Sequence, residues 1–396
     1  MVTSSHYVIF GFVFAFLSMA SFPGVCSGVS DSSLNSETLY WQRLDDIRSG
    51  RNYPDDVAKG TFQSFHRVDG SEKTFHYTTD VPNNYDPAKK MDLHIYLHGG
   101  VGISSNRISN AKMRRLKKLK IGGAISVYPS AWPTAKWWYE SQVKNIQKII
   151  RTLKESYNID GNRVFLHGIS DGAAGAYYFA SHLPTPFAGF IALLGSPHVL
   201  RPKHKVFGMT FPGNFVNKPI FALNTRDDHL FPADSVESLF DALNENDADI
   251  TFYTMPGDHF GMPWLITRKR DYEDFIAKKT RNPYPDSLLW QTDGQSEFNR
   301  IHWLILNGTR DGEKESAVVA SKSGNAVYLS SKNVSAVTLL ISTDHFDLSK
   351  NIQIWSDRKI VFDQKVSPDV HVLDKWFQLD RDRSMLFANE IYLDAL

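Results

Sequence analysis

The ten residues from Arg163 to Gly172, Arg-Val-Phe-Leu-His-Gly-Ile-Ser-Asp-Gly, decide the fold that we expect for this chain. The apolar run 164–166 is typical of a buried strand, and the small residues after Gly172 favour a helix. A sharp turn between strand and helix would hold Ser170 at the top of a sheet, in a strained backbone conformation. Side chains at Gly168 or Gly172 would collide with the neighbouring strand and helix. We interpret the segment as a nucleophile elbow with Ser170 as the nucleophile. A tight turn without chemistry is the alternative.

The length and composition describe an ordinary globular protein. A chain of 396 residues is suited to a large α/β domain and a smaller second domain. An apolar content of 42% and an aromatic content of 13% are enough for well-packed cores. The formal net charge of +1 argues against nucleic acid or a strongly acidic substrate as the organising partner, because such partners require a large basic excess.

The N-terminus has the pattern of a secretory signal. The first thirty residues contain no Lys, Arg, Asp or Glu, and an apolar run covers Tyr7 to Phe22. This run is short for a membrane span, so we predict a signal peptide over 1–27 and a secreted or periplasmic protein, with no stable membrane span after cleavage. Cleavage after Ser27 would also remove Cys26, the only cysteine. A retained N-terminal anchor is the main alternative, and a lipid-attached Cys26 is a weaker one.

Strands and helices alternate along the first three quarters of the chain. Residues 28–60 predict a linker with a short helix from Ser36 to Ile47. Strands are expected at 73–81, 92–97, 124–128, 164–166, 189–194, 219–224 and 250–255, and helices at 109–120 and 143–153. Such alternation predicts a mostly parallel sheet with helices on both faces, in an α/β domain that covers 61–288.

A glycine-rich segment follows the strand at 92–97. His98-Gly99-Gly100 lets the main chain approach a ligand closely, as a site that stabilises an oxyanion requires. We expect Gly100 or Val101 to supply one backbone N–H donor and Asp171, the residue after the nucleophile, to supply the other. A glycine loop that only turns the chain is the alternative.

Two further stretches allow a binding or a structural interpretation. The loop after the strand at 124–128 carries Trp132, Trp137 and Trp138, which either line a substrate cleft or pack in the core. The helix at 109–120 carries several Lys and Arg residues around an apolar stripe. We interpret these as a solvent-exposed helix face.

An activated serine requires a histidine and an acid. The imidazole takes the hydroxyl proton, and the carboxylate fixes the tautomer of the imidazole. In a fold with this elbow, both follow the serine in the order Ser, Asp, His, each just beyond a strand. The strand at 219–224 is followed by Asp227 and Asp228, and the strand at 250–255 is followed by His259. Both positions are therefore filled.

The segment 92–276 resembles the α/β-hydrolases, and within them the secreted esterases of the polyhydroxybutyrate depolymerase and feruloyl esterase type. The matching residues are His98-Gly99-Gly100, the run 157–164, the elbow 168–172, Asp228 with Pro232, and Gly257-Asp258-His259. The resemblance implies that Ser170 is the nucleophile, that His259 is the general base and then the acid, and that Asp228 orients His259. Asp227 is the rival acid, and Asp228 is preferred because the Asp-x-x-x-Pro pattern fits it. Asp258 is expected to hold a turn, and His229 to be a loop residue.

The last hundred residues predict a second domain over 289–396. Short β-rich runs separated by polar turns occur at 300–306, 317–321, 326–329, 336–342, 352–355, 359–362 and 391–393. With no strong helix among them, they predict a small all-β domain, a sandwich of immunoglobulin-like outline. We interpret it first as a scaffold or lid support and second as a carbohydrate-binding module with Trp303, Trp355 and Trp376 as a stacking face.

The sequence thus predicts a secreted serine carboxylic ester hydrolase that needs neither metal nor cofactor. Its partner would be an ester substrate, such as an acylated polysaccharide or a polyester. Two alternatives stay open: a serine peptidase of the prolyl oligopeptidase type, and a surface binding protein whose hydrolase domain is catalytically idle.

Overall fold

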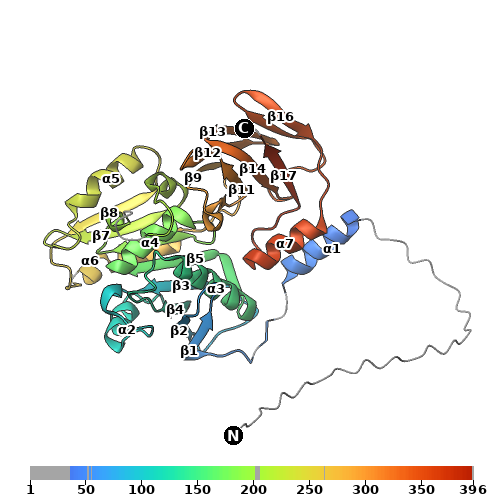
Figure 1. Ribbon diagram of the computed structural model, residues 1–396. Coiled ribbons are helices and arrows are strands. Elements are labelled where there is room, and N and C mark those ends of the chain that lie inside the picture. Colours follow the sequence, from blue (N-terminus) through green and yellow to red (C-terminus); the bar gives the residue numbers. More distant parts are fainter. Residues whose placement is uncertain (1–35, 51–52, 55, 201–205, 263, 395–396) are drawn as a thin grey trace, which may run out of the picture. The chain divides into compact units, whose positions relative to one another are not determined.

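A computed structural model describes residues 36–50, 53–54, 56–200, 206–262 and 264–394 (Figure 1). The predicted signal peptide at 1–27 lies outside the described residues. From Ser36 onward the chain forms one compact unit, so the proposed boundary between 288 and 289 stays a prediction. A search of the described residues finds no helix with the length and apolar character that membrane crossing requires.

The first part of the chain is built on an eight-stranded sheet. Its strands are β1 (Gly60–Arg67), β2 (Thr74–Val81), β3 (Met91–Leu97), β4 (Ile125–Pro129), β5 (Ile159–Ile169), β6 (Gly189–Leu193), β7 (Ile220–Thr225) and β8 (Ile250–Met255). They lie in the order β1-β2-β4-β3-β5-β6-β7-β8. The pairs β1/β2 and β2/β4 are antiparallel, and the other pairs are parallel. The predicted mostly parallel sheet is confirmed, and the sequence analysis missed only its edge strand β1.

Helices cover both faces of this sheet, as predicted. On one face, α3 (Glu140–Ser156), α4 (Asp171–His182) and α5 (Asp234–Asn244) pack on residues such as Ile95 of β3. On the other face, α2 (Asn110–Lys117) and α6 (Trp264–Lys278) pack on residues such as Tyr96. Neighbouring residues of one strand point to opposite faces, so both faces of β3 can be apolar and buried.

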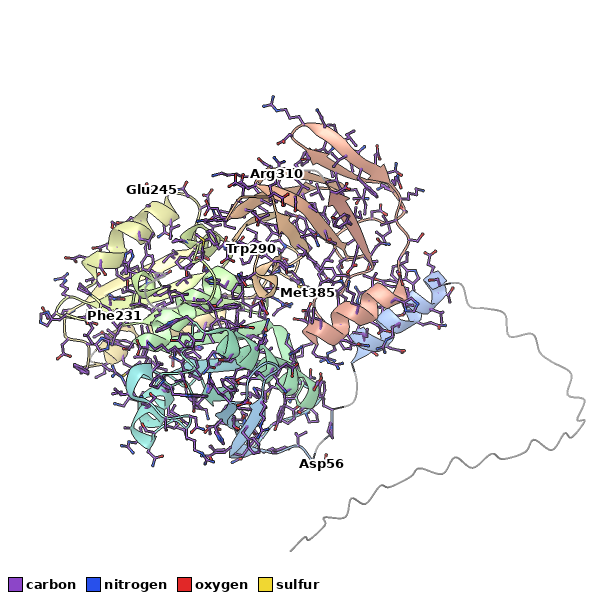
Figure 2. The ribbon with its side chains drawn as sticks, viewed as in Figure 1. Asp56, Phe231, Glu245, Trp290, Arg310 and Met385 are labelled. Atoms are coloured by element: carbon purple, nitrogen blue, oxygen red, sulfur yellow. The ribbon has the colours of Figure 1, made fainter. Side chains whose placement is uncertain are left out.

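The C-terminal part contains two further sheets around a core of its own. One has the order β10-β11-β14-β17 and the other β16-β15-β13-β12-β9. The strands are β9 (Ser287–Thr292), β10 (Arg300–Ile301), β11 (Leu304–Thr309), β12 (Ser316–Ser323), β13 (Ala326–Lys332), β14 (Val334–Ile341), β15 (Ile352–Ser356), β16 (Lys359–Gln364) and β17 (Asn389–Asp394). Trp290 is fully buried in this core (Figure 2). Strands β15 and β16 are joined as an antiparallel hairpin.

One expectation about the C-terminal part was wrong, because it contains a substantial helix. Helix α7 (Val370–Asp380) lies between β16 and β17 and buries Leu373 and Trp376. It packs beside α1 (Ser36–Ser49), whose Tyr40 and Leu44 join Leu373 in one apolar cluster (Figure 1). In addition, β13 and β15 pair in parallel, unlike the antiparallel sheets of an immunoglobulin domain. Neither the helix nor the parallel pair supports the immunoglobulin-like outline, which stays a prediction.

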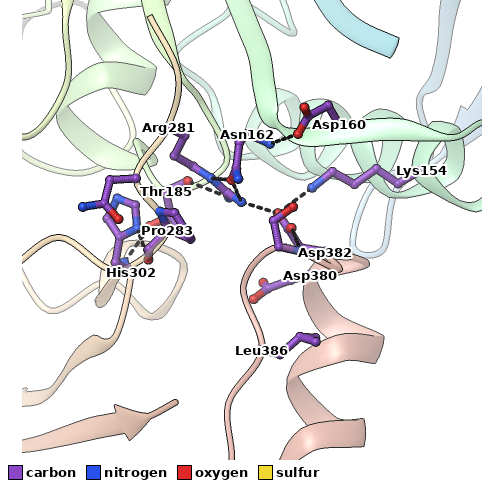
Figure 3. A network of polar contacts seen from close by, with 12 residues as sticks. Lys154, Asp160, Asn162, Thr185, Arg281, Pro283, His302, Asp380, Asp382 and Leu386 are labelled. Carbon is purple, nitrogen blue, oxygen red and sulfur yellow. Dashed lines mark hydrogen bonds and ion pairs between the residues drawn. The ribbon is translucent and has the colours of Figure 1, made fainter. Parts of the chain in front are cut away.

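A buried charge cluster joins the segment after α7 to the α/β part (Figure 3). The carboxylate of Asp382 lies 2.8 Å from Nζ of Lys154 on α3 and 2.9 Å from a guanidinium nitrogen of Arg281. All three side chains are at most 4% exposed. Burial would raise the pKa of Asp382, but Arg281 and Lys154 outweigh it and hold that pKa far below its usual range. Each of the three charges is therefore stabilised in the interior by its oppositely charged partner.

Replacing Asp382 with Asn would leave two buried cations without their counterion. We expect this substitution to lower the free energy of unfolding by about 3–5 kcal/mol, as measured by urea denaturation. The matched control is Asp374→Asn, since Asp374 forms a half-exposed pair with Arg43 and should contribute about 0–1 kcal/mol. Equal effects of the two substitutions would contradict the structural role of the buried cluster.

Candidate active site

The elbow places Ser170 between the end of β5 and the start of α4. Its backbone has φ 58° and ψ −123°, a conformation that costs a non-glycine residue about 1–3 kcal/mol. The two glycines of the motif make this turn sterically feasible. A Cβ at Gly168 would overlap the carbonyl group of Gly172, and a Cβ at Gly172 would overlap the carbonyl oxygen of Leu97 on β3. The predicted strand, sharp turn and helix are therefore all present, for the predicted steric reason.

His259 and Asp228 meet Ser170 at the carboxyl ends of the parallel strands. Nε2 of His259 lies 2.9 Å from Oγ of Ser170, and Nδ1 of His259 lies 2.7 Å from Oδ2 of Asp228. Asp228 is 2% exposed and His259 is 6% exposed, so water only weakly screens the interactions among these three side chains. A carboxylate can only accept, so Nδ1 carries the proton and Nε2 is free to accept the proton of Ser170. The arrangement can deprotonate the hydroxyl group.

The structure distinguishes the two candidate acids by their contacts. Oδ1 of Asp228 accepts hydrogen bonds from the backbone N–H groups of Leu230 and Phe231 at 2.8 and 2.9 Å, while Oδ2 faces His259. The side chain of Asp227 instead accepts the N–H of Gly257 at 3.4 Å and is exposed. Among the two, only Asp228 is therefore positioned to orient the imidazole.

The neighbouring polar residues have the structural roles that were expected. His229 is exposed in the loop after β7. Oδ1 of Asp258 accepts the backbone N–H groups of Phe260 and Gly261 at 3.0 and 2.8 Å, which closes the turn that presents His259. These two hydrogen bonds lower the pKa of Asp258.

The glycine segment 98–100 lies against the nucleophile, but only part of the expected donor set is free. A Cβ at Gly99 would lie 2.7 Å from Cβ of Ser170, so only glycine fits there. The N–H of Val101 already donates to Oδ2 of Asp171 at 2.9 Å, which corrects the expectation that Val101 is an alternative oxyanion donor. The backbone N–H groups of Gly100 and Asp171 are left as the candidate pair, and the latter lies at the N-terminus of α4, where N–H groups have no intrahelical acceptor.

His98 supports this segment and does not act on Ser170. Its Nε2 accepts the backbone N–H of Ala131 at 3.1 Å, so its proton lies on Nδ1, which donates to the carbonyl oxygen of Gly99 at 2.8 Å. Burial lowers the pKa of His98 to about 4. The ring is therefore neutral near pH 7, as both hydrogen bonds require.

The tryptophans expected at the substrate cleft lie elsewhere. Trp137 is fully buried and Trp138 is 4% exposed in the core of the sheet, and Nε1 of Trp137 donates to the carbonyl oxygen of His98 at 2.9 Å. Trp132 packs on Phe75, with ring centroids 5.3 Å apart. None of the three lines the cavity at Ser170, which corrects the expectation of an aromatic cleft and favours the packing alternative.

A cavity of about 450 Å³ opens at Ser170. Its lining residues are His98, Gly99, Gly100, Lys112, Arg115, Leu116, Ile169, Ser170, Asp171, Leu230, Phe231, His259 and Phe260. Sequence reasoning had not placed Lys112, Arg115, Leu230 or Phe260 at the site. Leu230 and Phe260 could have been found, because they lie next to the predicted acid and histidine in the sequence. Lys112 and Arg115 have no such neighbour in the sequence. Within the described ranges, no group of three or more His, Cys, Asp or Glu side chains converges as metal ligands would.

Comparisons with known proteins give a fold likeness only. No protein-family model matches this chain, and no curated protein matches it. Among solved structures, a thermostable esterase is 19% identical over 56% of this chain and 63% of its own, with a TM-score of 0.45. Esterase 2 of Thermogutta terrifontis is 14% identical over 55% of this chain and 94% of its own, with a TM-score of 0.43. A fluorophosphonate-binding serine hydrolase of Staphylococcus aureus is 14% identical over 55% and 99%, with a TM-score of 0.43.

The alignment thus spans under two thirds of the thermostable esterase. At such low identities and TM-scores, these likenesses carry no inference about activity. The chemistry of the site has to be understood from its own geometry.

The buried histidines predict a loss of stability in mild acid. Burial lowers the pKa values of His66, His98 and His182 to about 4, whereas the unfolded chain titrates near 6.5. Between these values the unfolded state binds more protons, so the free energy of unfolding falls as the pH falls from about 6.5 to about 4. We expect His98 alone to contribute roughly 3 kcal/mol to this fall.

Urea denaturation at pH 7 and pH 4.5 measures the effect. His98→Gln should make the pH dependence shallower, whereas replacing the exposed His229 with Gln should leave it unchanged. A free energy of unfolding that stays constant across this pH range would contradict the expectation.

Proposed function

We propose that this protein is a secreted serine carboxylic ester hydrolase that acts through an acyl-enzyme intermediate on Ser170. The observation that carries the proposal is the continuous contact from Oγ of Ser170 through His259 to Asp228, at 2.9 and 2.7 Å, beside an open cavity. Secretion enters the proposal through the apolar N-terminal run alone. An acylated polysaccharide or a polyester is the substrate that the sequence resemblance favours.

Acylation begins with proton transfer within this contact chain. Nε2 of His259 takes the proton of the Ser170 hydroxyl while Oγ forms a bond to the ester carbonyl carbon. The carbonyl oxygen becomes an oxyanion, and the N–H groups of Gly100 and Asp171 are the donors available to stabilise it. When the carbon–oxygen ester bond breaks, His259 returns the proton to the leaving alkoxide, which departs as the alcohol.

Deacylation repeats these steps with water. His259 takes a proton from water as the water oxygen bonds to the acyl carbon, and then gives it to Oγ of Ser170 as the acyl–oxygen bond breaks. Asp228 stabilises the imidazolium ion in both halves without itself being protonated. The products are the alcohol and the carboxylic acid, and Ser170 is restored.

The rim of the cavity favours an apolar portion in the substrate. Leu230 and Phe260 line the cavity but are 60% and 75% exposed. Exposed apolar side chains of this size beside a reactive group are typical of a binding surface. The ring centroid of Phe260 lies 5.3 Å from that of His259, and Leu230 lines the same cavity, so an acyl or alcohol group held there would lie close to the reacting carbonyl.

Removing the nucleophile or the base tests the reaction. We expect Ser170→Ala and His259→Ala to lower kcat for 4-nitrophenyl acetate by roughly 10³-fold or more, with an unchanged circular dichroism spectrum. The wild-type protein should prefer acyl esters to peptide 4-nitroanilides. Wild-type rates in either variant would refute the mechanism, and a preference for peptide amides would favour the peptidase alternative.

The adjacent aspartates provide a matched pair for the role of the acid. Asp228→Asn should lower kcat by about 10⁴-fold, because the amide favours the wrong imidazole tautomer. Asp227→Asn makes the same chemical change one residue away and should change kcat only slightly, since its side chain contacts the N–H of Gly257. Steady-state kinetics on one ester measure kcat for both variants and identify which aspartate acts as the acid. A larger loss in the Asp227 variant would overturn the assignment.

A further inference from the structure

Two basic residues of α2 line the cavity beside Ser170. Lys112 and Arg115 are three residues apart on one face of the helix and are partly buried, whereas Arg114 and Lys117 are exposed. The basic run was expected to be a solvent-exposed face, and the structure corrects this for the two residues at the cavity. The site therefore contains positive charge that the hydrolysis of a neutral ester does not require.

The hydrogen bonds of these two side chains go to backbone and hydroxyl oxygens, which carry no full negative charge. A terminal nitrogen of Arg115 donates to the backbone carbonyl oxygen of His259 at 3.1 Å, and its Nε is buried without an acceptor in the described part of the chain. Nζ of Lys112 donates to the carbonyl oxygen of Gly100 at 3.0 Å and to Oγ of Ser104. Neither side chain forms an ion pair with any carboxylate of the described residues.

Partial burial of these two cations is unfavourable, and of the two only Lys112 is partly compensated, by Asp171. Burial lowers the pKa of Arg115, and it also lowers the pKa of Lys112, although Asp171 opposes the latter effect. Among the residues that the structure describes, the only carboxylate lining the cavity is that of Asp171, and it already accepts the N–H of Val101. An anion bound in the cavity would relieve this imbalance, and the planar guanidinium of Arg115 is suited to a carboxylate in particular.

We infer that the site selects esters that carry a carboxylate on their acyl or alcohol part, and that Arg115 and Lys112 bind this carboxylate. The inference rests on the proposed ester hydrolysis and adds a substrate class to it. The substrate would be amphipathic, because the same cavity exposes Leu230 and Phe260 at its rim. The carboxylate would lie toward α2 while an apolar portion contacts these two side chains.

A competing explanation makes a different prediction. If the two cations only strengthened the field at the oxyanion, or only fixed the backbone of Gly100 and His259, they would act equally on charged and neutral esters. The ratio of kcat/KM values for two such esters separates these explanations, because any shared loss of catalytic efficiency cancels in it.

The test compares two matched substrate pairs. The first is the 4-nitrophenyl monoester of adipic acid against 4-nitrophenyl hexanoate, which places the charge on the acyl chain at constant chain length and leaving group. The second is 4-acetoxybenzoate against 4-acetoxybenzamide, which places the charge on the alcohol part. We expect the wild-type protein to prefer the anionic member of at least one pair, and added NaCl to reduce that preference.

Substitutions then locate the origin of the preference. Arg115→Gln should lower the anionic-to-neutral ratio by about tenfold or more, and Arg115→Lys should retain part of it. Arg114→Gln removes the same charge from an exposed neighbour on α2 and should leave the ratio unchanged.

Each outcome has a definite meaning. Hydrolysis of both esters without a preference, or a preference that survives Arg115→Gln, would overturn this inference while leaving the proposed function intact. If Arg115→Gln fails to fold, the salt dependence of the wild-type anionic-to-neutral ratio still tests the inference. A ratio that does not change with added NaCl would also overturn it. Failure to hydrolyse any ester would overturn the proposed function and this inference together.

Discussion

The strained turn at Ser170 is the constraint on which the rest of the structure depends. A positive φ at a serine is unfavourable, and it is retained because the surrounding backbone leaves no other path. The N–H of Ser170 donates to the carbonyl oxygen of Leu193 on β6 at 2.9 Å, and its own carbonyl accepts the N–H of Ala173 in α4 at 2.8 Å. The absence of side chains at Gly168 and Gly172 lets α4 pack against β5 and β3. The hydroxyl group is thereby fixed at the carboxyl end of the sheet, where Asp228 and His259 follow β7 and β8.

Most polar groups around this turn serve to hold it in place. His98 ties the glycine segment to Ala131, and the carboxylate of Asp171 holds the N–H of Val101. Farther away, the buried charges of Lys154, Arg281 and Asp382 join the C-terminal part to the α/β part. Each of these groups has a hydrogen-bond or ion-pair partner within the protein. Arg115 differs from them, because it lines the cavity at Ser170 and its Nε is buried without an acceptor among the described residues, and we therefore infer that it binds a ligand.

The parts of the site that the sequence predicted depend on local pattern and chain order. An elbow is recognised within ten residues, and an acid and a histidine that follow consecutive strands of one parallel sheet must lie at one edge. The errors concern side-chain direction, which no local pattern determines. The density of aromatic residues gave no sign that Trp137 is in the core. The N–H of Val101 is unavailable as an oxyanion donor because it donates to the side chain of Asp171, which is seventy residues away in the chain. Likewise, the composition of α2 could not reveal which of its basic residues face Ser170. Helix α7 was missed because it lies among short β-rich runs, where Leu373 and Trp376 give only a short apolar stripe.

The central claim is that the hydroxyl of Ser170 is activated by His259, and covalent trapping measures this most directly. A fluorophosphonate reacts with an activated serine by forming a bond from Oγ to phosphorus with loss of fluoride. Intact-mass measurement of the folded protein, followed by peptide mapping, should find a single adduct on Ser170, formed rapidly in the wild-type protein and very slowly in His259→Ala. A folded protein that stays unlabelled, or one that carries its adduct on another residue, would contradict the account.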